Sequence, residues 1–227
     1  MQRVTIQPMM RRLGQRFVTL LRGAGLVAMM VSILVALSGA AVAAPDRGPK
    51  VYLLRGFMNV FSLGLDELSA KLEARGIRSE VYNHTSATRL ADEIASEYKS
   101  GKTRPVILVG HSAGAAAVVD LVAALGQAGV PVALAVTLDI SSRPIPGGHV
   151  ATFLNLYSTN GALSKGPGFR GNLVNMDLGK NPQVGHFTID KVEEVQAIIL
   201  RYVASAAGRG GPRRQPAAAH AAMAPRT

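Results

Sequence analysis

One serine of the chain stands in a pattern that can turn its hydroxyl into a nucleophile. The pentapeptide Gly110-His111-Ser112-Ala113-Gly114 fits G-x-S-x-G, in which the serine occupies a sharp turn between a strand and a helix. Glycines at both ends carry no side chain that would clash across such a turn. An apolar run over 105–109 precedes the pattern, and an alanine-rich segment over 113–127 follows it. This setting favours nucleophilic chemistry at Ser112 over a tight connection or a phosphate-binding turn.

A serine hydroxyl reacts poorly unless a base takes its proton, and histidine is the usual base. The chain has five candidates: His84, His111, His149, His186 and His220. His220 lies in the C-terminal tail, and we expect His111 to pack as a structural residue beside the turn. We favour His186, which follows the last predicted strand, because the base comes last when the chain order is serine, acid, histidine. His149, in a loop rich in proline and glycine, is the alternative.

The acid of such a triad is expected between the serine and the histidine. Three carboxylates lie there: Asp120, Asp139 and Asp177. Asp120 falls in the middle of the predicted helix 113–127, where a solvated side chain is expected. Asp139 ends a predicted strand at the sheet edge that carries Ser112, and Asp177 ends a later strand. We favour Asp139 and keep Asp177 as the alternative; the acid would orient the imidazole and stabilise its charged form.

Acyl transfer also needs N–H donors for the oxyanion that develops on the substrate. The amide of Ala113 lies at the start of the predicted helix, where N–H groups are free to donate. A second donor is expected from the loop after the first strand, and we predict the amide of Phe57, with Met58 as second choice. Met58 and Phe61 are candidates to line an acyl pocket, although core packing is the other interpretation of this apolar loop.

These residues need a scaffold that brings them to one edge of a sheet. Apolar runs predict strands over 50–54, 78–82, 105–109, 131–138, 151–157 and 172–178, and helices are predicted over 64–75, 87–99, 113–127 and 190–206. Uninterrupted apolar strands that alternate with helices predict the α/β class, a mostly parallel central sheet with helices on both faces. Ligands of such sheets bind at the carboxyl ends of the strands.

Composition excludes several other functions. The 227 residues are 48% hydrophobic and include no cysteine, so one domain is expected, without disulfides or thiolate metal sites. The formal net charge is +11, but residues 1–44 hold five Arg and no acid, and residues 208–227 hold four Arg and no acid. Residues 45–207 therefore carry 16 basic against 14 acidic side chains. Because this middle part is nearly neutral, nucleic-acid binding is not expected.

The N-terminal segment has the order of a secretory signal peptide. Arginines precede an apolar run over 26–37, and small residues follow it up to Ala41-Val42-Ala43. We predict a signal peptide over 1–43 that is cleaved near Ala43, a linker over 44–50, a folded domain over 51–207 and a disordered basic tail over 208–227. The protein would then be exported, to the periplasm or outside the cell. A retained membrane anchor is the alternative.

The motifs together resemble those of the α/β-hydrolase superfamily. The resemblance covers about 51–206 and rests on the Ser112 pentapeptide, Gly56-Phe57 after the first strand, Asp139, and Gly185-His186-Phe187. An acid directly after the strand that follows the nucleophile helix is similar to the thioesterase branch. The resemblance implies a small α/β-hydrolase fold and a serine hydrolase that needs no metal or organic cofactor. The short domain leaves no clear lid insertion, which disfavours interfacial lipase action.

Two kinds of function stay open at this point. The first is hydrolysis of a small-molecule ester or thioester, with carboxylic esters favoured because export argues against cytoplasmic thioester substrates. Acyl transfer to an alcohol would use the same residues. The second is an exported binding or envelope-associated protein of the same fold without turnover. In that case the basic tail, with Arg213-Arg214, could contact an anionic membrane or envelope polymer.

Overall fold

A computed structural model describes residues 48–57, 62–159 and 161–210 of the chain. The predicted signal peptide, the predicted pocket residues Met58 and Phe61, and the tail from 211 onward lie outside these ranges. All structural statements below refer to the described residues.

Six parallel strands form the main sheet. They are β1 (Gly48–Arg55), β2 (Arg78–Asn83), β3 (Thr103–His111), β4 (Val132–Leu138), β6 (Gly148–Tyr157) and β8 (Phe169–Asp177). The strand order is β2-β1-β3-β4-β6-β8, and every neighbouring pair is parallel. The predicted α/β class with a parallel sheet is therefore confirmed. Two short strands, β5 (Pro144–Ile145) and β7 (Ser164–Lys165), pair separately, and two residues are too few to show a strand pattern.

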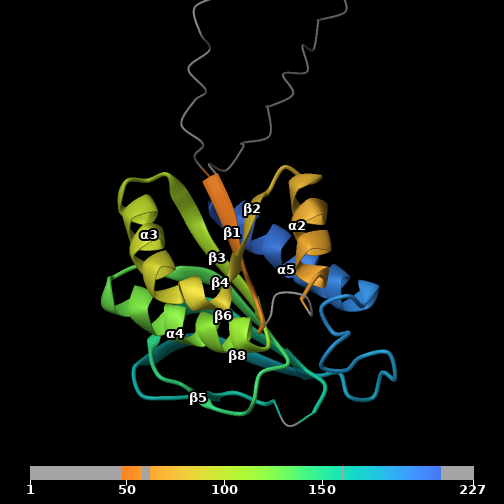
Figure 1. The fold of residues 1–227 in the computed structure, drawn as a ribbon. Coiled ribbons are helices and arrows are strands. Elements are labelled where there is room, and N and C mark those ends of the chain that lie inside the picture. Colours follow the sequence, from red (N-terminus) through yellow and green to blue (C-terminus); the bar gives the residue numbers. More distant parts are fainter. Residues whose placement is uncertain (1–47, 58–61, 160, 211–227) are drawn as a thin grey trace, which may run out of the picture. The chain divides into compact units, whose positions relative to one another are not determined.

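Four α-helices cover the two faces of this sheet, as predicted (Figure 1). Helices α3 (Ala87–Lys99) and α4 (Ala113–Gln127) pack on one face, and α2 (Gly64–Glu73) and α5 (Glu193–Gly210) pack on the other. A short 3-10 helix, η1 (His84–Ser86), precedes α3. Within the described ranges, no helix has the length and apolar character to cross a membrane.

Two segment boundaries differ from the sequence prediction. Strand β1 begins at Gly48, two residues before the predicted strand 50–54, so residues 48 and 49 of the predicted linker belong to the sheet. Helix α5 begins at Glu193 and continues to Gly210, so residues 208–210, assigned to the disordered tail, are helical. Neither change affects the order of elements.

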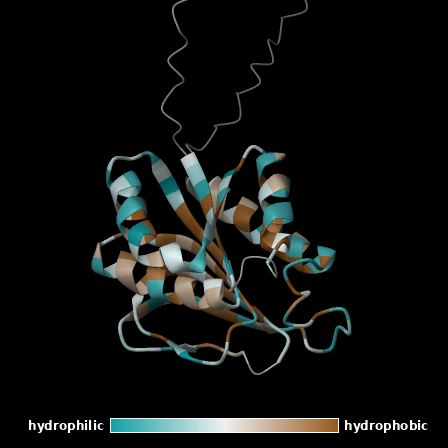
Figure 2. Ribbon diagram, viewed as in Figure 1, coloured by the Kyte–Doolittle hydropathy of each residue, from teal (hydrophilic) through white to brown (hydrophobic). Residues whose placement is uncertain are grey.

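The apolar core consists of one layer on each side of the sheet. In β1, Tyr52 and Leu54 face α3 and α4, whereas Val51 and Leu53 face α2 and α5. Figure 2 shows hydrophobic residues in brown along the central strands and hydrophilic residues in teal on the helices. Because both sides of the central strands are buried, their sequences are continuously apolar. Burial of each large aliphatic side chain contributes about 1.5–3 kcal/mol, and this core holds the carboxyl ends of the strands in place.

Candidate active site

Ser112 lies on a strained turn between β3 and α4. Its backbone has φ 57° and ψ −120°, a conformation that residues with a side chain rarely adopt. The turn is tight because α4 packs directly on β1: a Cβ at Gly114 would lie 2.0 Å from the carbonyl oxygen of Leu54. A Cβ at Gly110 would lie 2.3 Å from the carbonyl oxygen of Gly114. Both glycines of the pentapeptide are thus required by close backbone approach.

The side chains of Ser112, His186 and Asp139 form one hydrogen-bonded chain. The Ser112 Oγ lies 3.1 Å from the His186 Nε2, and the His186 Nδ1 lies 2.8 Å from the Asp139 Oδ2. His186 comes from the segment between β8 and α5, and Asp139 directly follows β4. An imidazole that donates its Nδ1–H to a carboxylate keeps the Nε2 lone pair free to accept a hydroxyl proton. The arrangement can therefore take the proton from Ser112.

Asp139 is held as a carboxylate by its surroundings. Its side chain is 7% exposed, against 42% for His186. Burial raises the pKa of Asp139, but hydrogen bonds from Ser158 and His186 outweigh it, so the pKa lies below its ordinary value. Ser158 donates both its backbone N–H, at 2.8 Å, and its hydroxyl, at 2.9 Å, to the Asp139 Oδ1. An ionised Asp139 can stabilise an imidazolium on His186.

The structure does not bring the alternative acid and base to Ser112. The exposed Asp177 accepts the backbone N–H of Gly179 at 2.8 Å and so closes a local turn at the end of β8. His149 is the second residue of β6, at the amino end of a strand whose carboxyl end lies near the serine edge. Asp120 is on α4 and pairs with Arg143 at 3.2 Å.

Both predicted oxyanion donors lie beside the serine. Ala113 is the first residue of α4, where backbone N–H groups have no partner within the helix. Phe57 follows Gly56, and a Cβ at Gly56 would lie only 3.0 Å from the Cβ of Ser112. The loop after β1 therefore runs directly against the serine turn. Donation by these two amides remains a prediction.

A cavity of about 160 Å³ opens at the serine. It is lined by Gly56, Phe57, Ser62, His111, Ser112, His186 and Phe187. Phe57 and Phe187 are, with Leu63, the large hydrophobic side chains that the described ranges leave exposed. The Phe187 ring meets the His186 ring edge-on at 5.1 Å between centroids. The cavity thus has an apolar rim. In the described ranges, no three His, Asp or Glu side chains cluster in a way that could hold a metal ion.

His111 makes contacts that sequence reasoning did not predict. It is buried at 1% exposure, as expected of a structural residue. Its Nδ1 lies 2.9 Å from the Oγ of Ser62, and its Nε2 lies 2.8 Å from the carbonyl oxygen of His186. Ser62 was missed because a single serine in a loop shows no pattern that indicates its partner.

No family model matches this chain, and no curated protein matches it. Among solved structures, it is similar to a Xanthomonas campestris pv. campestris protein assigned to the hydrolases of the alpha/beta superfamily. That match has 15% identity and a TM-score of 0.37, and covers 67% of this chain and 98% of that chain. A second is the type II thioesterase BorB from the borrelidin biosynthetic cluster, with 11% identity, a TM-score of 0.41, and coverage of 69% of this chain and 93% of that chain.

The class of fold follows from the chain's own topology. A parallel sheet with the order β2-β1-β3-β4-β6-β8, and a strained serine on the turn from β3 into α4, define an α/β-hydrolase-like fold.

Proposed function

We propose that this protein is a serine hydrolase that cleaves small esters or thioesters through an acyl-enzyme on Ser112. The observation that carries the proposal is the continuous hydrogen-bonded chain from Ser112 through His186 to the buried Asp139. It supplies a nucleophile, a base and an orienting acid in the geometry that acyl transfer requires.

In the first half of the reaction, the Ser112 Oγ attacks the substrate carbonyl carbon while the His186 Nε2 takes the hydroxyl proton. The carbonyl oxygen becomes negatively charged and accepts hydrogen bonds from the amides of Ala113 and Phe57. The bond to the leaving group then breaks, and His186 returns its proton to the departing alkoxide or thiolate. The acyl group remains on Ser112 as an ester.

In the second half, a water molecule replaces the leaving group. The water oxygen attacks the acyl carbon while His186 takes one proton from the water. The bond between the acyl carbon and the Ser112 Oγ then breaks, and His186 gives that proton to the Oγ. The products are a carboxylic acid and the free enzyme. In both halves the Asp139 carboxylate stabilises the imidazolium form of His186.

The cavity supports a small apolar acyl group. Its volume is about 160 Å³, and the aromatic rings of Phe57 and Phe187 lie at its rim. We place the enzyme outside the cytoplasm because of the signal-like segment over 1–43, and this location favours carboxylic esters over thioesters. Acyl transfer to an alcohol in place of water would follow the same steps.

A fluorophosphonate probe tests the proposal, because it forms a stable adduct only with an activated serine. We expect mass spectrometry of the purified protein to find the adduct on Ser112. Ser112→Ala should abolish the adduct and lower kcat on p-nitrophenyl esters at least about 1,000-fold. Ser100→Ala is the control, because Ser100 is exposed and its hydroxyl donates to the carbonyl oxygen of Glu97, away from the proposed triad. The mass of the exported protein also shows whether the chain begins near Ala44.

Folded wild-type protein that neither labels nor turns over any ester of a graded acyl series would contradict the proposal. It would favour the alternative of an exported binding or envelope-associated protein without turnover. Binding of the full chain to anionic vesicles, lost when residues 208–227 are deleted, would support that alternative.

A further inference from the structure

Two buried side chains outside the proposed triad join the segments that carry it. Ser62, fully buried, precedes α2, and His111, 1% exposed, precedes the nucleophile. The backbone N–H of Gly56 donates to the Ser62 Oγ at 2.9 Å. The Ser62 Oγ lies 2.9 Å from the His111 Nδ1, and the His111 Nε2 lies 2.8 Å from the His186 carbonyl oxygen. One chain of hydrogen bonds thus runs from the loop after β1, through the serine turn, to the histidine loop.

The chemistry of the end groups sets the direction of these bonds. A carbonyl oxygen only accepts, so the His111 Nε2 carries a proton and donates a hydrogen bond to the carbonyl oxygen of His186. In the neutral ring the Nδ1 then accepts, and the Ser62 hydroxyl donates to it while accepting the Gly56 N–H. Burial lowers the pKa of His111, which favours this neutral ring. The Ser62 Oγ and both ring nitrogens of His111 thus each have a partner. Removal of either side chain leaves a buried neighbour unpaired.

A second set of contacts fixes the position of the Ser62 segment. The Gly64 N–H donates to the Asp190 Oδ2 at 3.0 Å. The fully buried Gln196 donates to the carbonyl oxygens of Gly64, at 3.1 Å, and Asp190, at 2.8 Å. A Cβ at Gly64 would lie 2.3 Å from the Asp190 carbonyl oxygen, so the two segments are in direct backbone contact. Ser62 is therefore tied to the stretch that follows His186 as well as to His111.

We propose that Ser62 and His111 are positioning residues that fix the Phe57 amide and the His186 imidazole in place relative to Ser112. Ser62 acts through Gly56, which precedes Phe57 and packs against Ser112. His111 acts through the backbone of His186. This inference rests on the proposed function, because positioning affects a rate only if Ser112 reacts. Small displacements of oxyanion donors and of the base cost activity, since both are needed in the transition state.

The first test is Ser62→Ala. Loss of the hydroxyl leaves the buried N–H of Gly56 and the Nδ1 of His111 without a partner. We expect kcat to fall about 10- to 100-fold, with KM unchanged within about twofold, because transition-state contacts are lost rather than substrate binding. The matched control is Thr103→Val. Thr103 is buried at the amino end of β3, far from Ser112, and its hydroxyl donates to Glu97 at 2.9 Å. Its kcat should equal that of the wild type.

A second pair of variants separates positioning from packing. In His111→Gln the amide can still donate to the His186 carbonyl, whereas His111→Leu fills space without a donor. We expect Gln to retain at least about tenfold more kcat than Leu. On the wild-type protein, nitrogen-15 NMR of histidine should show His111 as the neutral Nε2–H form, identified by the signal that is absent from His111→Gln.

The outcomes distinguish this inference from the proposed function. Wild-type protein that does not label with the phosphonate overturns both. Wild-type protein that labels, together with a folded Ser62→Ala of unchanged kcat, overturns only the positioning role. If Ser62→Ala does not fold, equal activity of His111→Gln and His111→Leu overturns it, as does an Nδ1–H form of His111 in the wild type.

Discussion

At the scale of single residues, backbone strain and candidate chemistry coincide. Ser112, with φ 57°, and Asp139, with φ 50°, are the residues other than glycine that have positive φ in the described ranges. Each stands at the carboxyl end of one of two adjacent parallel strands, β3 and β4. The chain leaves the sheet within one residue at both places, and each side chain bonds His186. Such strain persists where the surrounding structure enforces it, and it is frequent at functional sites.

Asp139→Asn tests the assignment of the acid. The amide cannot stabilise an imidazolium, and it can donate to the Nδ1 and so favour the wrong tautomer of His186. We therefore expect kcat to fall about 100- to 10,000-fold in steady-state ester hydrolysis, with the fold intact by circular dichroism. Asp177→Asn is the matched control, because an amide oxygen can still accept the Gly179 N–H; its kcat should stay within about twofold of the wild type. A larger loss in the control would point to Asp177 as the acid.

Chain order and strand ends predicted that Ser112, His186 and one of two aspartates lie at one edge of the sheet. Ser112, Asp139 and His186 follow three different elements, and a parallel sheet brings the ends of its strands to one edge. Ser62 could not be predicted in this way. It lies 49 residues before its partner His111, and nothing around it distinguishes it from any other loop serine. The choice between Asp139 and Asp177 also needed coordinates, because both follow strands.

At the scale of elements, local patterns predicted all four helices of the described ranges but not all of their bounds. The predicted bounds of α3 and α4 match the observed ones. Helix α5 begins three residues later than predicted. The side chain of Asp190 accepts the backbone N–H of Gly64, so it is not available to cap the helix at the predicted start. The helical spacing of Val192, Val195, Ile199 and Val203 cannot reveal a tertiary contact of this kind.

Two glycine variants test how tightly α4 must approach the sheet. Gly114→Ala would place a Cβ 2.0 Å from the Leu54 carbonyl oxygen. We expect it to lower the free energy of unfolding by about 1–3 kcal/mol and to disturb the Ser112 turn. Gly208 is also in a helix, and a Cβ there would meet nothing within 4 Å. Gly208→Ala should therefore raise the free energy of unfolding by up to about 1 kcal/mol. Urea titration measures both. Similar effects of the two variants would show that the close approach of α4 does not constrain the turn.

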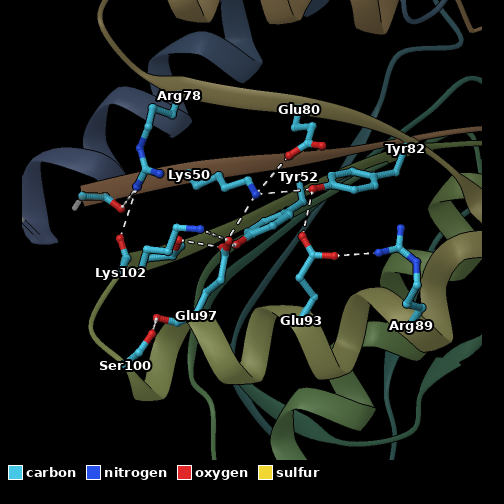
Figure 3. Close-up of polar contacts among 12 residues, drawn as sticks. Lys50, Tyr52, Arg78, Glu80, Tyr82, Arg89, Glu93, Glu97, Ser100 and Lys102 are labelled. Carbon is cyan, nitrogen blue, oxygen red and sulfur yellow. Dashed lines mark hydrogen bonds and ion pairs between the residues drawn. The ribbon is translucent and has the colours of Figure 1, made fainter. Parts of the chain in front are cut away.

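At the scale of the whole folded unit, the edge of the sheet opposite the serine carries a charged cluster (Figure 3). Lys50, only 9% exposed, lies 3.1 Å from a carboxylate oxygen of Glu80 and 3.6 Å from one of Glu97. The Tyr52 hydroxyl donates to Glu97 at 2.5 Å, and Lys102 donates to it at 3.0 Å. The sequence prediction placed Lys50 at the start of a strand, but it could not indicate the partners of Lys50 on β2 and α3. The cluster joins β1, β2 and α3 far along the strands from Ser112.

The cluster gives stability a defined dependence on pH. Burial raises the pKa of Glu97, but hydrogen bonds from Tyr52, Lys102 and Thr103 and the charge of Lys50 outweigh it, so the pKa falls from 4.5 to about 2. The folded state therefore binds fewer protons at this group than the unfolded chain does between these values. The stabilisation is complete above about pH 4.5 and is lost as the pH falls toward 2.

Glu97→Gln should accordingly weaken the fold without weakening the chemistry. We expect the free energy of unfolding at pH 7 to fall by about 2 kcal/mol, because Lys50 loses a mostly buried partner. The difference in this free energy between variant and wild type should narrow as the pH falls from about 4.5 toward 2. Glu73→Gln, at an exposed position at the end of α2, is the control and should match the wild type in urea titrations at each pH. The kcat of folded Glu97→Gln at pH 7 should stay within about twofold of the wild type. A large loss of kcat with little loss of stability would instead mean that the two ends of the strands are coupled. The charged cluster around Glu97 would then help to set the geometry at Ser112.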